Sequence, residues 1–87
     1  MELNADLFLN GERIRSLKAS LPEGILFNRR LEQALLSLCR ECRAPAPMWL
    51  TRNTREFAGC RMTVFHREQF PGEVWFDRMA VRLEGGS

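Results

Sequence analysis

The sequence predicts a single α+β domain over residues 1–84, an antiparallel sheet that carries two helices on one face. Three observations predict it: an alternating segment with an Asn-Gly turn near the start, two stretches of helical spacing in the middle, and two further strand-like segments at the end. Eighty-seven residues, 45% hydrophobic and 28% charged, suit one folded globular domain rather than two. We expect residues 85–87 to form a frayed tail.

An N-terminal β-hairpin is the first predicted element. The apolar residues that alternate with mostly polar ones are Leu3, Ala5, Leu7 and Leu9. Asn10 and Gly11 follow, the favoured pair for a two-residue type I′ turn, because both positions need positive φ. Residues 13–19 are predicted to form the return strand. Their apolar positions change phase between Ile14 and Leu17, which suggests a β-bulge or a short strand.

Two helices are predicted next, of which the first spans residues 28–43. Its apolar stripe consists of Leu31, Ala34, Leu35, Leu38, Cys39 and Cys42. Asn28 is the expected N-cap, and Pro45 and Pro47 prevent continuation of the helix. Pro47 is also the predicted first residue of the second helix, which we expect to end at Gly59.

A C-terminal β-hairpin completes the predicted sheet. Residues 61–66 alternate as a strand does, and residues 70–73 fit a type II turn with Pro71 and Gly72 at its centre. Residues 74–83 are predicted to form the last strand. The residues expected on one face of that strand are Trp75, Asp77, Met79, Val81 and Leu83.

Charge and hydropathy argue against a polybasic, a membrane-spanning or an exported protein. The net charge is only +2, from 13 basic and 11 acidic residues, which argues against a polybasic protein, although residues 40–67 carry a local excess of +4. No apolar stretch approaches the roughly 18 residues of a spanning helix, so we expect no membrane partner. The start of the chain lacks the pattern of a signal peptide. We therefore expect a cytoplasmic protein whose three cysteines are reduced.

A zinc site is one hypothesis for the cysteines, and no other cofactor is predicted. Cys39, Cys42, Cys60 and His66 form a C-x2-C and a C-x5-H pair, and zinc prefers four such ligands. However, Cys39 and Cys42 lie on the apolar stripe of the first helix, where reduced cysteine packs as a small hydrophobe. Packing in the core is therefore the favoured interpretation.

Nucleic-acid binding is a second hypothesis. Two helices followed by a hairpin resemble a winged helix-turn-helix in outline, and the second helix carries Arg52, Asn53 and Arg55, residue types that contact phosphates and base edges. Glu56 in the same helix and the nearly neutral overall charge oppose it.

Catalysis is not predicted. His66 is the only histidine, and although Glu56 or Glu68 could orient it, the chain has no nucleophile elbow and no glycine-rich phosphate loop. Trp49 and Trp75 are expected either in the core or in a binding patch. A set of polar residues also has two interpretations: a structural ion-pair arrangement or an interaction surface. It consists of Asn53, Glu56, Gln69, Asp77 and Arg78.

A family resemblance covers about two thirds of the chain. The residues that carry it are Leu38-Cys39-Arg40-Glu41, Pro47-Met48-Trp49-Leu50, Asn53-Thr54, Glu56-Phe57-Ala58, Phe65, Glu68-Gln69-Phe70 and Phe76-Asp77-Arg78. This pattern resembles that of short uncharacterised bacterial proteins related to those of clostridia. The resemblance implies a shared fold or surface around Trp49, Asn53, Glu56, Phe65, Gln69 and Asp77, and it implies no activity. Cys42 and Cys60 lie outside the pattern.

The sequence therefore favours a small non-catalytic module for protein interaction or assembly, with a protein partner or self-association. A nucleic-acid-binding module and a small zinc-binding domain remain the alternatives.

Overall fold

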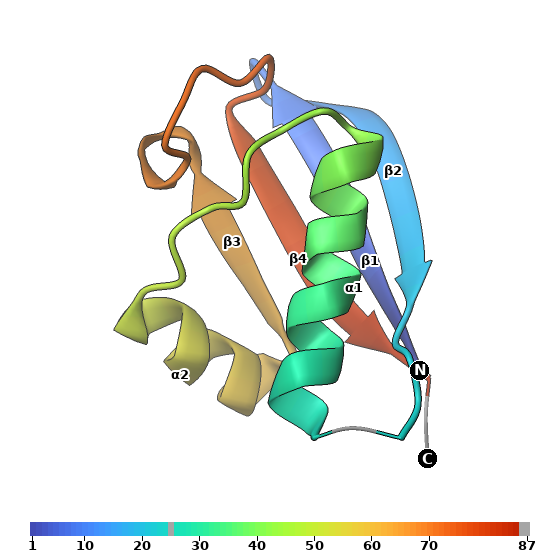
Figure 1. Cartoon of the computed structure of the whole chain (residues 1–87). Helices are drawn as coiled ribbons and strands as arrows, with labels where there is room; N and C mark the ends of the chain where they lie inside the picture. Colours follow the sequence, from blue (N-terminus) through green and yellow to red (C-terminus); the bar gives the residue numbers. More distant parts are fainter. Residues whose placement is uncertain (25, 86–87) are drawn as a thin grey trace.

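The computed structural model of the chain describes residues 1–24 and 26–85, which form an antiparallel sheet with two helices on one face (Figure 1). The strands are β1 (Glu2–Leu9), β2 (Glu12–Ser20), β3 (Met62–His66) and β4 (Arg78–Glu84); the helices are α1 (Phe27–Glu41), α2 (Thr51–Cys60) and the short 3-10 helix η1 (Arg67–Gln69). The predicted α+β class is confirmed.

The sheet order is β2-β1-β4-β3, so the first and last strands pair in its centre. The register places Leu3 opposite Leu83, Ala5 opposite Val81 and Leu7 opposite Met79. Because side chains alternate along a strand, all six point to the same face, and all six are buried. In Figure 1, α1 and α2 cover this face, with α1 packed on β1 and β2 and α2 packed on β3.

The β1–β2 hairpin forms as predicted. Asn10 and Gly11 have φ angles of 53° and 84°, the left-handed conformation that a type I′ turn requires. The register shifts within the hairpin, because Leu7 pairs with Arg15 and the next residue, Phe8, pairs with Arg13. The skipped residue between these partners, Ile14, is therefore the bulge.

The core lies between the sheet and α1. The apolar stripe of α1 supplies Ala34, Leu35, Leu38 and Cys39, and Cys42 just beyond the helix is also buried. Phe65 from β3 and Phe76 from the segment before β4 are fully buried in the same core.

The predicted N-cap of the first helix and the predicted start of the second helix are wrong. In α1 the N-cap is Leu26, and no side chain caps the helix, so Asn28 does not have its predicted role. The second helix begins at Thr51 rather than at Pro47, because the segment before it is held in extended form. Gly59 lies inside α2, which instead ends where Arg61 adopts a left-handed conformation with φ 59°.

The predicted type II turn at residues 70–73 is also wrong. Such a turn needs a positive φ at Gly72, and Gly72 does not have one. The last strand consequently begins at Arg78 rather than at residue 74, so Trp75 and Asp77 precede it. β3 and β4 still pair as antiparallel neighbours, but η1 and an irregular segment connect them in place of a tight turn.

Contacts of the irregular segment explain the late start of β4. Phe70 and Phe76 are both buried and meet edge to face, with ring centroids 5.2 Å apart. The Trp75 indole Nε1 donates a hydrogen bond of 3.0 Å to the carbonyl of Cys42, beyond the end of α1. The Trp75 ring also meets that of Phe76, with centroids 5.5 Å apart. These two ring contacts and the indole hydrogen bond hold a loop where periodicity alone suggests a strand.

Within residues 1–24 and 26–85, no helix has both the length and the apolar character needed to cross a bilayer. Of the predicted tail, residues 86 and 87 lie outside the described part of the chain.

The turn glycine offers a test of the hairpin. Gly11→Ala should lower the free energy of unfolding by about 1 kcal/mol, because only glycine adopts positive φ without a Cβ penalty. Gly59→Ala is the matched control: it lies in a helix with open space around the added methyl group, so it should stabilise by about 0.5 kcal/mol. Urea unfolding of both variants measures the two changes, and a Gly11→Ala variant as stable as the unmodified chain would contradict the assignment of the turn.

Candidate functional site

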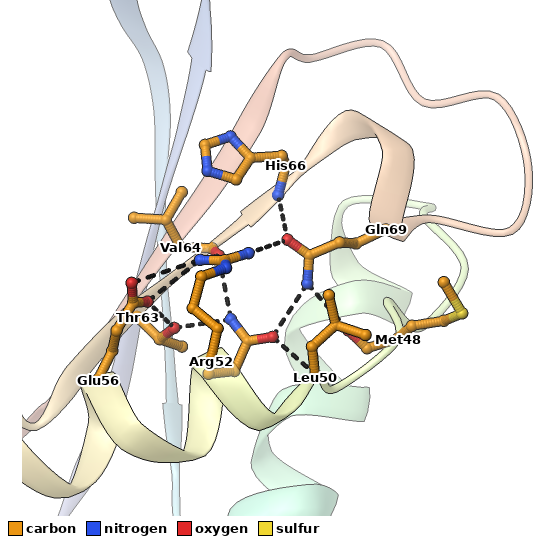
Figure 2. A network of polar contacts seen from close by, with 9 residues as sticks. Met48, Leu50, Arg52, Glu56, Thr63, Val64, His66 and Gln69 are labelled. Carbon is orange, nitrogen blue, oxygen red and sulfur yellow. Dashed lines mark hydrogen bonds and ion pairs between the residues drawn. The ribbon is translucent and has the colours of Figure 1, made fainter.

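Most of the predicted polar site residues meet where α2, β3 and η1 come together (Figure 2). Two side-chain amides, Asn53 from α2 and Gln69 from η1, form the centre of this network. Asn53 is 0% exposed and Gln69 is 5% exposed, so their polar groups need partners within the protein.

Asn53 satisfies all four of its hydrogen-bonding positions. Its Oδ1 accepts from the backbone N–H of Leu50 at 2.9 Å and from Nε2 of Gln69 at 3.0 Å. Its Nδ2 donates to the hydroxyl of Thr63 at 2.7 Å and to the carbonyl of Val64 at 3.1 Å. An amide has two acceptor and two donor positions, so none is left for a ligand.

Gln69 is equally engaged. Besides its bond to Asn53, its Nε2 donates to the carbonyl of Met48 at 3.0 Å. Its Oε1 accepts from the backbone N–H of His66 at 3.0 Å and from Nη2 of Arg52 at 2.6 Å. Gln69 thus joins α2, the end of β3 and the segment before α2.

Arg52 and Glu56 form the charged, half-exposed side of the network. Nη1 of Arg52 lies 3.3 Å from Oε1 of Glu56, one helical turn away. The Thr63 hydroxyl donates to the same carboxylate at 2.6 Å. The pKa of Glu56 is lowered from its ordinary value, first by the Thr63 hydrogen bond and then by the Arg52 charge.

The network closes the outer edge of β3. The carbonyl of Val64 points away from β4 and accepts from Asn53 and, at 3.4 Å, from Arg52. An edge strand otherwise offers such groups to other chains. Three residues of the polar set, Asn53, Glu56 and Gln69, therefore lie together with Arg52, and the four bind one another.

Two of the three residues proposed for nucleic acid are thus engaged within the fold. Asn53 is buried, and Arg52 bonds to Glu56, Gln69 and Val64. Arg55 lies on the exposed side of α2.

Asp77 and Arg78 form a second cluster beside the β1–β2 turn. Asp77 accepts from the backbone N–H of Asn10 at 2.7 Å and from Nη2 of Arg67 at 2.7 Å. The Arg78 guanidinium lies 4.3 Å from the centre of the Phe8 ring, a cation–π contact. Both residues fix the loop before β4 against the N-terminal hairpin.

The four candidate zinc ligands lie in different surroundings. Cys39 and Cys42 are buried, Cys60 is exposed at the end of α2, and His66 is exposed at the end of β3. Burial raises the pKa of Cys39 to about 11, with a further contribution from Cys42. In the described part of the chain, no three residues among His, Cys, Asp and Glu gather as a metal site would require.

An apolar hollow of about 650 Å³, here called the α1–α2 pocket, lies between α1, α2 and residues 46–49. The large apolar residues that line it are Phe27, Leu31, Leu35, Leu36, Trp49 and Phe57, and the polar ones are Asn28, Glu32 and Thr54. Figure 1 shows the three chain segments that frame it.

Trp49, a predicted site residue, forms one wall of the α1–α2 pocket. Its indole Nε1 donates to the hydroxyl of Thr54 at 2.7 Å. Its ring lies 5.9 Å from that of Phe57 and 5.5 Å from that of Phe65. These contacts fix the ring while leaving 39% of the residue exposed.

Exposed apolar side chains concentrate at this pocket. Of the ten large hydrophobic residues exposed in the described part of the chain, six line the pocket or are chain neighbours of residues that do. They are Leu26, Phe27, Leu36, Met48, Trp49 and Leu50. A cluster of exposed apolar residues around a hollow typically marks an interaction site.

Sequence reasoning missed Phe27 and Leu36 as site residues. Leu36 is 37% exposed because it lies outside the buried stripe of α1, which consists of Ala34, Leu35, Leu38 and Cys39. The signal was present, since an apolar residue beyond the core stripe widens the apolar arc of the helix more than the core requires.

The amide network can be tested with an isosteric change. Asn53→Asp replaces the Nδ2 donor with an acceptor that faces the carbonyl of Val64, so it should cost about 2–4 kcal/mol of unfolding free energy. Asn28→Asp is the matched control. It is exposed in the first turn of α1, where a negative charge is favourable, so it should change stability by less than about 0.5 kcal/mol. Urea unfolding measures both, and equal small effects would contradict a structural role for the network.

The lowered pKa of Glu56 predicts a loss of stability in acid. A carboxyl group with a lower pKa in the folded than in the unfolded state stabilises the fold above its ordinary pKa of 4.5, and this contribution disappears as the pH falls through the folded pKa. Glu56→Gln should therefore flatten the decline in melting temperature between about pH 6 and about pH 3. Glu84, whose pKa is lowered chiefly by Arg82, adds a decline of the same sign, which Glu84→Gln removes separately. An unchanged slope in Glu56→Gln would rule out this role for Glu56.

Comparison of the chain with protein-family models, with curated proteins and with solved structures finds no significant match in any of the three. The resemblance to clostridial proteins therefore stays a prediction.

Proposed function

We propose that this domain is a non-catalytic protein-interaction module and that the α1–α2 pocket receives apolar side chains of its partner. The observation that carries the proposal is the clustering of exposed Phe27, Leu36 and Trp49 at one hollow. Isolated exposed apolar residues need no explanation, but a hollow framed by several of them does.

The walls of the pocket are held in place before any partner binds. α1 packs its buried stripe on the sheet, and Asn53 ties α2 to β3. The connecting segment is held by Met48, whose backbone N–H donates to the carbonyl of Gln69 at 2.7 Å. Such preorganisation supports tight binding, because fewer groups must be ordered on association.

The composition of the pocket also suits a protein partner. Aromatic and aliphatic side chains supply the apolar contact area of typical interfaces, and tryptophan is enriched among residues that dominate binding energy. Asn28, Glu32 and Thr54 provide the few polar groups that would orient a bound segment.

The nucleic-acid alternative has less support. Arg52 and Asn53 are engaged in the network, so only Arg55 of the three proposed residues is left to contact nucleic acid.

A reduced, cytoplasmic setting fits the proposal because all three cysteines are free.

Selection of binding peptides tests the proposed site without knowledge of the natural partner. A displayed library of random peptides, selected on the immobilised domain, should yield apolar-rich sequences. Leu36→Glu should weaken a selected, fluorescently labelled peptide by at least about tenfold in an anisotropy titration, because it places a charge in the apolar pocket.

Ile14→Glu is the matched control, since Ile14 is 39% exposed on the β2 bulge, close to the 37% of Leu36. It should leave peptide affinity unchanged. Equal losses in the two variants, or failure to select any peptide on a chain that is monomeric at the concentration used, would refute the proposed site.

A further inference from the structure

We infer that the occupant of the α1–α2 pocket is the same surface of a second copy of this chain, in a symmetric two-fold dimer. This inference rests on the proposed function and names its partner. It is carried by the self-complementary character of the surface around the pocket, which combines a hollow, projecting apolar side chains and charges of both signs.

Two strongly exposed apolar residues directly precede residues that line the hollow. Leu26, at the start of α1, is 79% exposed, the most of any large hydrophobic residue in the described part of the chain, and it directly precedes the lining residue Phe27. Met48, 55% exposed, directly precedes the lining residue Trp49. In a two-fold contact the same patch meets itself, so a patch that holds both a hollow and a projection can fill its own hollow.

The charges on this surface are also of both signs. Glu32 lines the pocket, Arg29 lies one helical turn before it on α1, and Arg55 lies one turn before the lining residue Ala58 on α2. Within residues 1–24 and 26–85, none of these three charges has an ion-pair partner. A two-fold axis through the patch can place Glu32 of each copy near an arginine of the other copy. A partner surface that carried only positive or only negative charge would pair with some of these three side chains and repel the others.

The required contact area is compatible with the size of the chain. A stable interface buries about 800 Å² per partner. The chain exposes 5610 Å², so the dimer would cover about one seventh of it. Burial of the exposed apolar side chains would also add to a core that is small in a chain of 87 residues.

Sedimentation equilibrium of the full chain tests the inference. The average mass should rise from 10.1 kDa toward twice that value as the concentration increases from about 1 µM to about 1 mM. Leu36→Glu should weaken association at least about tenfold, as should Ala58→Arg, which fills the pocket from α2. Ile14→Glu should associate as the unmodified chain does, and circular dichroism confirms that each variant is folded.

The outcomes separate the dimer from the proposed function. A chain that stays monomeric throughout, yet binds a selected peptide in a manner sensitive to Leu36→Glu, overturns the dimer and retains the interaction module. A dimer that survives both pocket variants, or that Ile14→Glu abolishes, places the contact elsewhere and also overturns the inference. The inference is supported if association is lost in Leu36→Glu and Ala58→Arg but is kept in Ile14→Glu.

Discussion

The pair of buried amides formed by Asn53 and Gln69 is the interaction on which the second half of the fold depends. Their direct bond joins α2 to η1, and their remaining bonds reach Leu50, Thr63, Val64, His66 and Met48. Each of these segments is short and would have little stability alone. Because every donor and acceptor of the two amides is satisfied, the cost of burying them is offset, and one arrangement of the segments is favoured over others.

The two edges of the sheet are protected in different ways. On β3, the side chains of Asn53 and Arg52 from α2 donate hydrogen bonds to the carbonyl of Val64 and so cover the strand edge there. β2, the other edge, has the bulge at Ile14 and exposed cations such as Arg13 and Lys18, features that discourage pairing with another strand. With both edges protected, the surface that most invites association lies on the helical layer.

Local patterns were enough to predict the parts of the fold that local physics determines. The Asn10-Gly11 turn, the bulge after it and the buried stripe of α1 follow from φ preferences and periodicity, and all are found. The starts of α2 and β4 were predicted four residues too early, because long-range contacts set them: Met48 with Gln69, and Trp75 with Cys42. Asn53, Glu56 and Gln69 were predicted to form either a structural arrangement or an interaction surface, and sequence alone could not show that they and Arg52 satisfy one another.

Residue type therefore misleads in both directions in this protein. Asn53 and Gln69, polar types that suggest recognition, are buried as structural groups, whereas Phe27 and Leu36, apolar types that suggest a core, remain exposed at the α1–α2 pocket. The two sets are nevertheless connected, because the amides hold α2 and the segment that carries Trp49, two of the three walls of the pocket. A change at Asn53 would then weaken binding by displacing those walls and would lower stability with it, while a change at Leu36 would act on binding with stability preserved. The ratio of the two effects, rather than the loss of binding alone, separates residues that build the surface from residues that touch the partner.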